Sequence, residues 1–116
     1  MIGIDIVQIS RISKLKAKYG TKFMEKFLNQ NEILLVKSDE SLAGFYAAKE
    51  AVSKALKTGV GSEFSFLDVE IFKDKNRAPK LRFKDDLVKK FGIKNSDLSI
   101  SHDGGFAIAA VILTHF

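Results

Sequence analysis

The fold is decided by the stretch ESLAGFYAAKEAVSKALK, which occupies residues 40–57. This stretch predicts the clearest helix of the chain, because apolar residues recur through it with the period of a helix. Ser38 or Asp39 can cap its first turn, and Gly59 follows its last turn. The predicted apolar face consists of Leu42, Phe45, Tyr46, Val52 and Leu56. A second face carries Ala43, Ala47, Glu50 and Lys54. A long helix with one side toward the core is therefore the centre of the predicted fold.

Shorter elements surround this helix in the prediction. Alternating residues predict a strand at 2–9, in which Asp5 faces away from the isoleucines at positions 2, 4 and 6. A basic helix follows, capped by Ser10 and ended by Gly20. The remaining predicted elements are one or two short helices in 22–37, strands at 64–72 and 80–83, a short helix at 83–91, and a hairpin of 98–102 with 106–113. Because helices and strands mix without a βαβ alternation, we expect an α+β fold, with an antiparallel sheet packed against the long central helix and shorter helices.

Composition limits the chemistry that is available. The chain has 116 residues, and we expect residues 1–116 to form a single domain. It has no cysteine and two histidines, His102 and His115, which argues against disulfides and against a zinc site. A metal here would be a hard cation bound by oxygen atoms, such as Mg²⁺. No apolar run could span a bilayer and the first residues do not resemble a signal peptide, so we expect a cytoplasmic protein without a membrane partner.

Positive charge is concentrated in one segment. The net charge of the chain is +5. Residues 11–26 contain six basic residues and one acid, so this segment alone carries the whole excess. The six basic residues are Arg11, Lys14, Lys16, Lys18, Lys22 and Lys26. Such a segment indicates an acidic partner, which can be nucleic acid, an anionic cofactor or an acidic protein.

Four side chains are candidates for chemistry, and each has a plain alternative. Asp5 in its apolar strand either faces water or binds a cation, because an acid is costly to bury without a partner. Glu50 and Lys54 stand at the spacing of a surface ion pair on a helix, or they serve a phosphate and metal site. His102 ends a strand beside a glycine turn, where it can donate to a phosphate, act as an acid or base, or bond to Asp103.

The order and spacing of three motifs resemble a known family. The first motif is GIDIV at residues 3–7, followed by Arg11. The second is FYAAKEAVSKA at residues 45–55, followed by TGVG at residues 58–61. The third is SISHD at residues 99–103, which leads into FAIA at residues 106–109. Over essentially its whole length the sequence resembles the holo-acyl-carrier-protein synthases, the short bacterial 4′-phosphopantetheinyl transferases.

The resemblance implies a reaction and its participants. It implies transfer of the 4′-phosphopantetheine arm of coenzyme A to a serine of apo acyl carrier protein, with release of adenosine 3′,5′-bisphosphate, in support of fatty acid biosynthesis. It implies Mg²⁺ as the cofactor and an acidic acyl carrier protein as the partner. It also implies the 4′-phosphopantetheinyl transferase-like fold and a homotrimer with sites between subunits.

The resemblance also assigns residues to these roles. It implies that Asp5 and Glu50 bind Mg²⁺ and that, together with Lys54 and His102, they form the catalytic set. The coenzyme A-binding residues that it implies are Lys49, Ser53, Lys54, Gly59, Gly61, Pro79, Ser101 and His102. The residues that it implies for docking of the carrier protein are Arg11, Lys14 and Lys18.

Two positions depart from the pattern of the family. Phe45 stands where the family often has an arginine, which removes one phosphate contact unless another lysine or arginine replaces it. Ala78 stands where the turn before Pro79 usually carries a glycine, which affects contacts on the adenine side.

Two other functions compete with the transferase. A small nucleic-acid-binding module would fit the sequence pI near 9.5, but the chain has no recognition-helix signature and this function leaves Asp5 and Glu50 without a role. A Mg²⁺-dependent phosphohydrolase would share the metal site and transfer the phosphoryl group to water. The glycines at 59 and 61 do not decide the matter, because they lack P-loop spacing and also suit the end of a helix. We expect the transferase, with no nucleic-acid partner.

Overall fold

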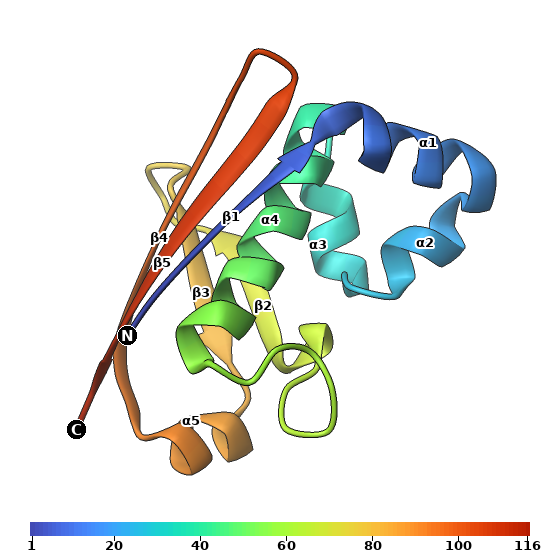
Figure 1. Cartoon of the computed structure of the whole chain (residues 1–116). Coiled ribbons are helices and arrows are strands. Elements are labelled where there is room, and N and C mark those ends of the chain that lie inside the picture. Colours follow the sequence, from blue (N-terminus) through green and yellow to red (C-terminus); the bar gives the residue numbers. More distant parts are fainter.

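The structure is a computed structural model that describes residues 1–116. In Figure 1 the central helix α4 lies against a sheet of β1, β5 and β4, with α1, α2 and α3 near the beginning of α4 and α5 beyond its end. The elements are β1 (Ile2–Gln8), α1 (Ile9–Tyr19), α2 (Thr21–Glu25), α3 (Gln30–Leu35), α4 (Asp39–Leu56), the 3₁₀ turn η1 (Phe66–Asp68), β2 (Val69–Lys73), β3 (Pro79–Phe83), α5 (Asp85–Phe91), β4 (Ile93–Asp103) and β5 (Phe106–His115). No helix is both long enough and apolar enough to cross a membrane.

The sheet is antiparallel, and β5 lies in its middle. The strand order is β1-β5-β4, while β2 and β3 pair separately as a second antiparallel sheet. Gly104 and Gly105 form the turn between β4 and β5. Their φ angles are 58° and 86°, which residues other than glycine rarely adopt. The predicted α+β class, the long central helix and the hairpin at this turn are confirmed. The Ser38 cap of α4 is also confirmed, because its side chain accepts a hydrogen bond from the backbone N–H of Ser41.

Two predicted elements differ from the observed ones. The first helix begins at Ile9 without a side-chain cap, so the prediction of a Ser10 cap is wrong. There the Ile9 N–H donates to the carbonyl of Gly105, 2.9 Å away, which ties the strand-to-helix turn to the hairpin. The predicted strand at 64–72 is also wrong in its first half. Ser65 caps the turn η1 instead, and extended pairing begins only at Val69.

The two faces of the sheet have opposite environments. Asp5 does face away from the isoleucines of β1, as predicted, but α4 covers the face that carries Asp5. Val7 on this covered face is buried, as are most of its neighbours on β5. The outer face carries exposed apolar side chains of β1 and β5, namely Ile2, Ile4, Ile6, Phe106, Ile108 and Ile112. The isoleucines of β1 therefore do not contribute to the core of this chain.

One glycine sets the distance between β1 and α4. A Cβ atom placed on Gly3 would lie 1.9 Å from the carbonyl oxygen of Ala51 and 2.6 Å from the backbone nitrogen of Ala55. Both contacts are to backbone, which cannot rotate away. The alanines at 47, 48, 51 and 55 are completely buried at this junction, so small residues on both elements let the strand and the helix touch.

We predict that Gly3→Ala lowers the free energy of unfolding by about 3 kcal/mol, because β1 must move away from α4. The matched control is Gly61→Ala, where an added Cβ meets nothing within 4 Å and the φ angle is ordinary. There we expect no loss of stability. Urea unfolding followed by circular dichroism measures both variants, and equal stability of the two would contradict the packing argument.

Candidate functional site

One face of α4 carries a row of polar side chains. Tyr46, Glu50 and Lys54 follow one another at intervals of one helical turn, so they lie on the same face. Asp5 of β1 reaches the end of this face, with its Oδ1 atom 2.8 Å from the Nζ atom of Lys54. Arg11 of α1 reaches the other end, with its guanidinium carbon 5.8 Å from the ring centre of Tyr46. We call these five residues the α4 polar row.

The charges of the α4 polar row act together on Lys54. The hydrogen bond to Asp5 raises the pKa of Lys54, and the negative charges of Asp5 and Glu50 add to this effect, while partial burial opposes it. The Asp5 side chain is only 14% exposed, whereas that of Lys54 is 54% exposed. The carboxylate is therefore held in place by the fold, and the ammonium group that neutralises it can move.

The same two carboxylates fit a hard divalent cation. In this structure the Lys54 ammonium pairs with Asp5, and Glu50 stands one helical turn before Lys54 on the same face of α4. Carboxylate oxygens are the ligands that Mg²⁺ prefers, and Mg²⁺ usually keeps waters and substrate phosphates as its other ligands. No group of three or more acidic or histidine side chains gathers in the structure. Asp5 and Glu50 would therefore supply two ligands and leave the remaining positions to water and substrate.

A second group of candidates surrounds a groove beside β4. The groove has a volume of about 220 Å³ and contains His102, Lys73 and Pro79. Phe45 lines it from α4 and Ile100 from β4, which gives it an apolar part between the basic side chains. We call it the β4 groove. An apolar floor with a lysine and a histidine suits a flat ring that carries a phosphate.

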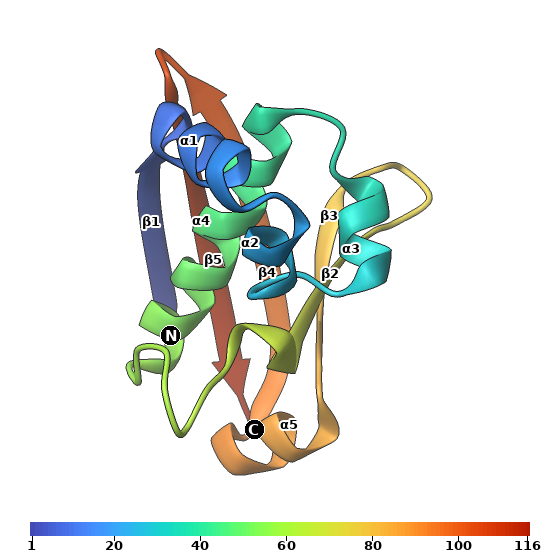
Figure 2. The same cartoon turned by 90° about the vertical axis from the view of Figure 1, so that its right-hand side faces the viewer.

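The structure does not bring the two groups together within one chain. Asp5 lies on β1 and His102 lies on β4, which are the two outer strands of the sheet, with β5 between them (Figure 2). Two strand spacings correspond to about 10 Å between the backbones. The β4 groove also faces the side of α4 that carries Phe45, and this side is turned away from Glu50 and Lys54. The predicted catalytic set is thus divided between two flanks of α4.

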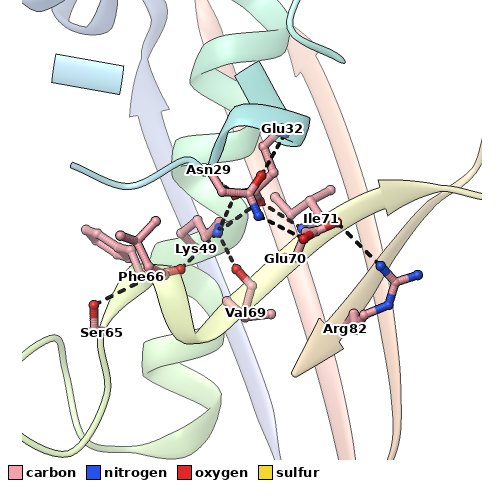
Figure 3. A network of polar contacts seen from close by, with 10 residues as sticks. Asn29, Glu32, Lys49, Ser65, Phe66, Val69, Glu70, Ile71 and Arg82 are labelled. Atoms are coloured by element: carbon pink, nitrogen blue, oxygen red, sulfur yellow. Dashed lines mark hydrogen bonds and ion pairs between the residues drawn. The ribbon is translucent and has the colours of Figure 1, made fainter. Parts of the chain in front are cut away.

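Two predicted coenzyme A-binding residues lie in the core instead. Lys49 is 0% exposed, and its Nζ atom lies 2.9 Å from Glu32 Oε2 and 2.9 Å from the carbonyl oxygen of Phe66 (Figure 3). It also donates to the carbonyl of Val69. Burial lowers the pKa of Lys49, and the Glu32 charge opposes this shift. Because all its bonds are internal, Lys49 ties α3, η1 and β2 to α4 and is not available to a ligand.

Ser53 is the other core residue. It is buried, and its hydroxyl donates to the carbonyl oxygen of Glu50 at 2.7 Å, within its own helix. The expectation that Lys49 and Ser53 bind coenzyme A stays a prediction, and both side chains are buried in this structure.

The remaining predicted residues are accessible. Ser101 and His102 are both exposed, but neighbouring residues of a strand point to opposite faces, so Ser101 lies on the outer face beside Ile108. Gly59 and Gly61 lie in the exposed loop after α4, and Pro79 begins β3. The predicted docking residues Arg11, Lys14 and Lys18 are all exposed on α1.

Sequence reasoning missed two residues near these groups. Tyr46 had been assigned to the apolar face, although it stands one helical turn before Glu50, and that spacing was a usable signal. Burial raises the pKa of Tyr46 and Glu50 raises it further, while Arg11 opposes both, so the hydroxyl stays protonated at neutral pH. Lys73 carried no signal, because only the folded β2–β3 pair brings it to Pro79 and the β4 groove.

Known proteins match this chain along nearly all of its length. The sequence profile of the 4′-phosphopantetheinyl transferase superfamily matches residues 1–111. The holo-[acyl-carrier-protein] synthase of Campylobacter fetus is 64% identical over 113 residues, which cover 97% of this chain and 98% of that protein. The synthase of Nautilia profundicola is 63% identical over 113 residues with the same coverage. A crystal structure of the Helicobacter pylori holo-[acyl-carrier-protein] synthase in complex with coenzyme A has a TM-score of 0.96 at 48% identity and covers 98% of this chain and 100% of that chain.

These matches define first a class of protein, the 4′-phosphopantetheinyl transferase superfamily. Within that superfamily, the chain belongs to the holo-[acyl-carrier-protein] synthase family of enzymes. The family, the fold and the enzyme class expected from the sequence are confirmed.

We predict that Lys49→Met lowers the free energy of unfolding by about 3–5 kcal/mol, because it leaves the Glu32 carboxylate buried without its counter-ion. The double variant Glu32→Leu/Lys49→Met should recover part of this loss, since neither charge is then buried alone. Lys89→Met, at an exposed position of α5, is the control and should change stability little. Chemical denaturation measures all three, and a Lys49→Met variant as stable as the control would contradict the structural role.

Proposed function

We propose that this protein transfers the 4′-phosphopantetheine arm of coenzyme A to a serine of apo acyl carrier protein, in a Mg²⁺-dependent reaction that supports fatty acid biosynthesis. The products are holo acyl carrier protein and adenosine 3′,5′-bisphosphate. The observation that carries the proposal is the ion pair of Asp5 with Lys54, one helical turn after Glu50, which sets a strand carboxylate against the helix face that carries Glu50. The names of the relatives and the coenzyme A complex of the Helicobacter pylori synthase support the substrates. A cytoplasmic location is part of the proposal.

In the proposed reaction, the serine oxygen forms a bond to the phosphorus atom that carries the pantetheine arm. The bond from that phosphorus to the bridging oxygen of the pyrophosphate breaks, the leaving bisphosphate takes the electron pair, and the serine proton is released. Phosphoryl transfer depends mainly on positioning and on neutralising charge on the phosphate oxygens. When bound to Asp5 and Glu50, Mg²⁺ would supply positive charge at these oxygens.

The chain's own side chains add to this charge. Lys54 sits beside both carboxylates and is half-exposed, so its flexible ammonium can leave Asp5 and contact a phosphate oxygen. His102 and Lys73 line the β4 groove and would hold the nucleotide phosphates. Lys73 would supply the positive charge that the family often draws from the position of Phe45, while Phe45 itself forms part of the apolar floor.

Assembly of three chains would join the two groups. The outer sheet face exposes isoleucines, with Ile4 at 57% and Ile2 at 68% exposure, and such contiguous apolar surface marks a protein interface. We propose a homotrimer in which the α4 polar row of one chain faces the β4 groove of a neighbour. What supports this arrangement is the division of the site in one chain together with the apolar face. Arg11, Lys14 and Lys18 would meet the acidic carrier protein beside the α4 polar row.

We predict that a mixture of the protein, apo acyl carrier protein, coenzyme A and Mg²⁺ yields a carrier whose mass has increased by one phosphopantetheine group. Asp5→Asn and Glu50→Gln should each lower the rate by at least about 10²-fold, because each removes a charge that the transition state needs. Both variants keep the side-chain shape and should stay folded. Mass spectrometry of the carrier gives the readout.

Asp85→Asn, the same chemical change at an exposed position of α5, is the matched control and should retain full activity. Transfer at the normal rate by Asp5→Asn or Glu50→Gln would refute the metal assignment. Coenzyme A hydrolysis without any modified carrier would instead identify a phosphohydrolase.

We predict that the wild-type protein is a trimer in solution and that Ile4→Asp is monomeric and inactive, because it places a charge in the centre of the apolar face. Leu34→Asp introduces the same charge at an exposed apolar position of α3, off this sheet, and should leave the trimer intact. Sedimentation velocity distinguishes the two assembly states. A monomeric wild-type protein with full transferase activity would rule out the shared site.

A further inference from the structure

One carboxylate ties the helix α1 to the beginning of α4. Asp39 is the first residue of α4, and its Oδ2 atom accepts a hydrogen bond from the hydroxyl of Ser13. Its other oxygen, Oδ1, lies 3.7 Å from the Nζ atom of Lys16. Both partners belong to α1, so the two oxygens of a single side chain hold neighbouring turns of the same helix.

Other contacts hold the first half of α1 but not its second half. The Ile9 N–H donates to the carbonyl oxygen of Gly105, 2.9 Å away, and Ile12 is completely buried. Residues 17–20, by contrast, are all exposed. The contacts to Asp39 are therefore the last hydrogen bond and the last ion pair that join α1 to another element before the helix ends.

This tie also sets the direction of the basic side chains that are proposed to meet the carrier. An α-helix turns by about 100° per residue, so Ser13 and Lys16 lie on one flank of α1, while Arg11 and Lys18 lie on another. Lys14 lines the groove that contains both tied residues. A rotation or tilt of α1 would redirect all three docking residues at once.

The charge of Asp39 by itself opposes docking. Its carboxylate lines the same groove as Lys14, where it would repel an acidic carrier. We propose that Asp39 is a positioning residue for carrier binding. By accepting the hydrogen bond from Ser13, it holds α1 in the orientation in which the three docking residues face the carrier. This inference rests on the proposed function, since it uses the carrier of that reaction.

Removal of the carboxylate separates this role from a purely electrostatic one, because the two predict opposite changes. If only the charge of Asp39 affects docking, Asp39→Ala makes the surface more positive and releases Lys16, so an acidic carrier binds more tightly. If Asp39 positions α1, the same variant leaves the second half of the helix without its tie, and the carrier binds more weakly.

The experiment titrates a carrier protein whose acceptor serine is replaced by alanine into the enzyme with coenzyme A and Mg²⁺, and measures the dissociation constant by calorimetry. For Asp39→Ala we expect the dissociation constant to rise at least about threefold, the effect of one lost hydrogen bond. Asp39→Asn keeps an oxygen that accepts from Ser13 and removes the charge, so it should bind the carrier at least as tightly as the wild-type protein does.

Turnover of the natural carrier gives a second readout. In Asp39→Ala, the KM for the carrier should rise with the dissociation constant, while kcat and the KM for coenzyme A should each change by less than about twofold. A general loss of structure would affect both substrates, so the difference between the two KM values identifies an effect on docking.

The chain offers a matched control and a second route to the same bond. Asp85→Ala removes a carboxylate from the first residue of another helix, α5, where it is exposed, and it should keep wild-type carrier affinity. Ser13→Ala removes the donor of the hydrogen bond and should weaken carrier binding even if Asp39→Ala does not fold. The double variant should bind no more weakly than Asp39→Ala alone, because both changes remove one interaction.

The other outcomes overturn the inference. Unchanged or tighter carrier binding by Asp39→Ala means that the carboxylate does not position α1. Binding by Asp39→Asn that is as weak as that of Asp39→Ala means that the hydrogen bond from Ser13 does not carry the effect. An equal rise in both KM values means that Asp39 has only a structural role. Failure of the proposed function is seen separately, because the wild-type protein would then give no phosphopantetheine mass increase on the natural carrier.

Discussion

The contact between Gly3 and the backbone of α4 is the constraint on which the other features depend. Because Gly3 has no Cβ atom, the backbones of β1 and α4 can come into direct contact. Two residues further along the strand, Asp5 points to the same side as Gly3 and comes within an ion-pair distance of Lys54. A wider gap would separate the carboxylate of the strand from the polar face of the helix, and Asp5 would no longer reach Lys54. The ion pair between β1 and α4, and with it the proposed metal site, is thus a consequence of packing between small residues.

The buried pair of Glu32 and Lys49 fixes the position of neighbouring elements on the other side of α4. It holds α3, the turn η1 and β2 against the helix. Phe66 lies on that turn, so the pair indirectly sets the aromatic support behind Tyr46. A buried ion pair adds less to the free energy of unfolding than apolar packing of the same volume. With every hydrogen bond satisfied, however, it permits only one arrangement of the helices and strands that it connects. Both sides of α4 are therefore fixed before any substrate binds.

The sequence supported some of these conclusions and not others, for identifiable reasons. The central helix, the Ser38 cap and the glycine hairpin were predictable because each depends on local chemistry. The burial of Lys49 was also readable, since it stands one turn after Phe45 and close to one turn before Val52, inside the apolar face. The covered face of β1 was not predictable, because alternation separates two faces without saying which one a distant helix will cover. The position of Lys73 depends on how two strands pair and had no local signal.

The exposed apolar face of the sheet affects the tendency of a newly synthesised chain to aggregate. An edge strand with alternating isoleucines, such as β1, offers unpaired backbone groups next to an apolar surface, which is the pattern that promotes aggregation. In the proposed trimer, a newly made chain would carry this hazard until neighbouring chains cover the face. Assembly would thus serve as protection as well as completing a site, and the amount of chain made at one time would decide how long each copy stays exposed.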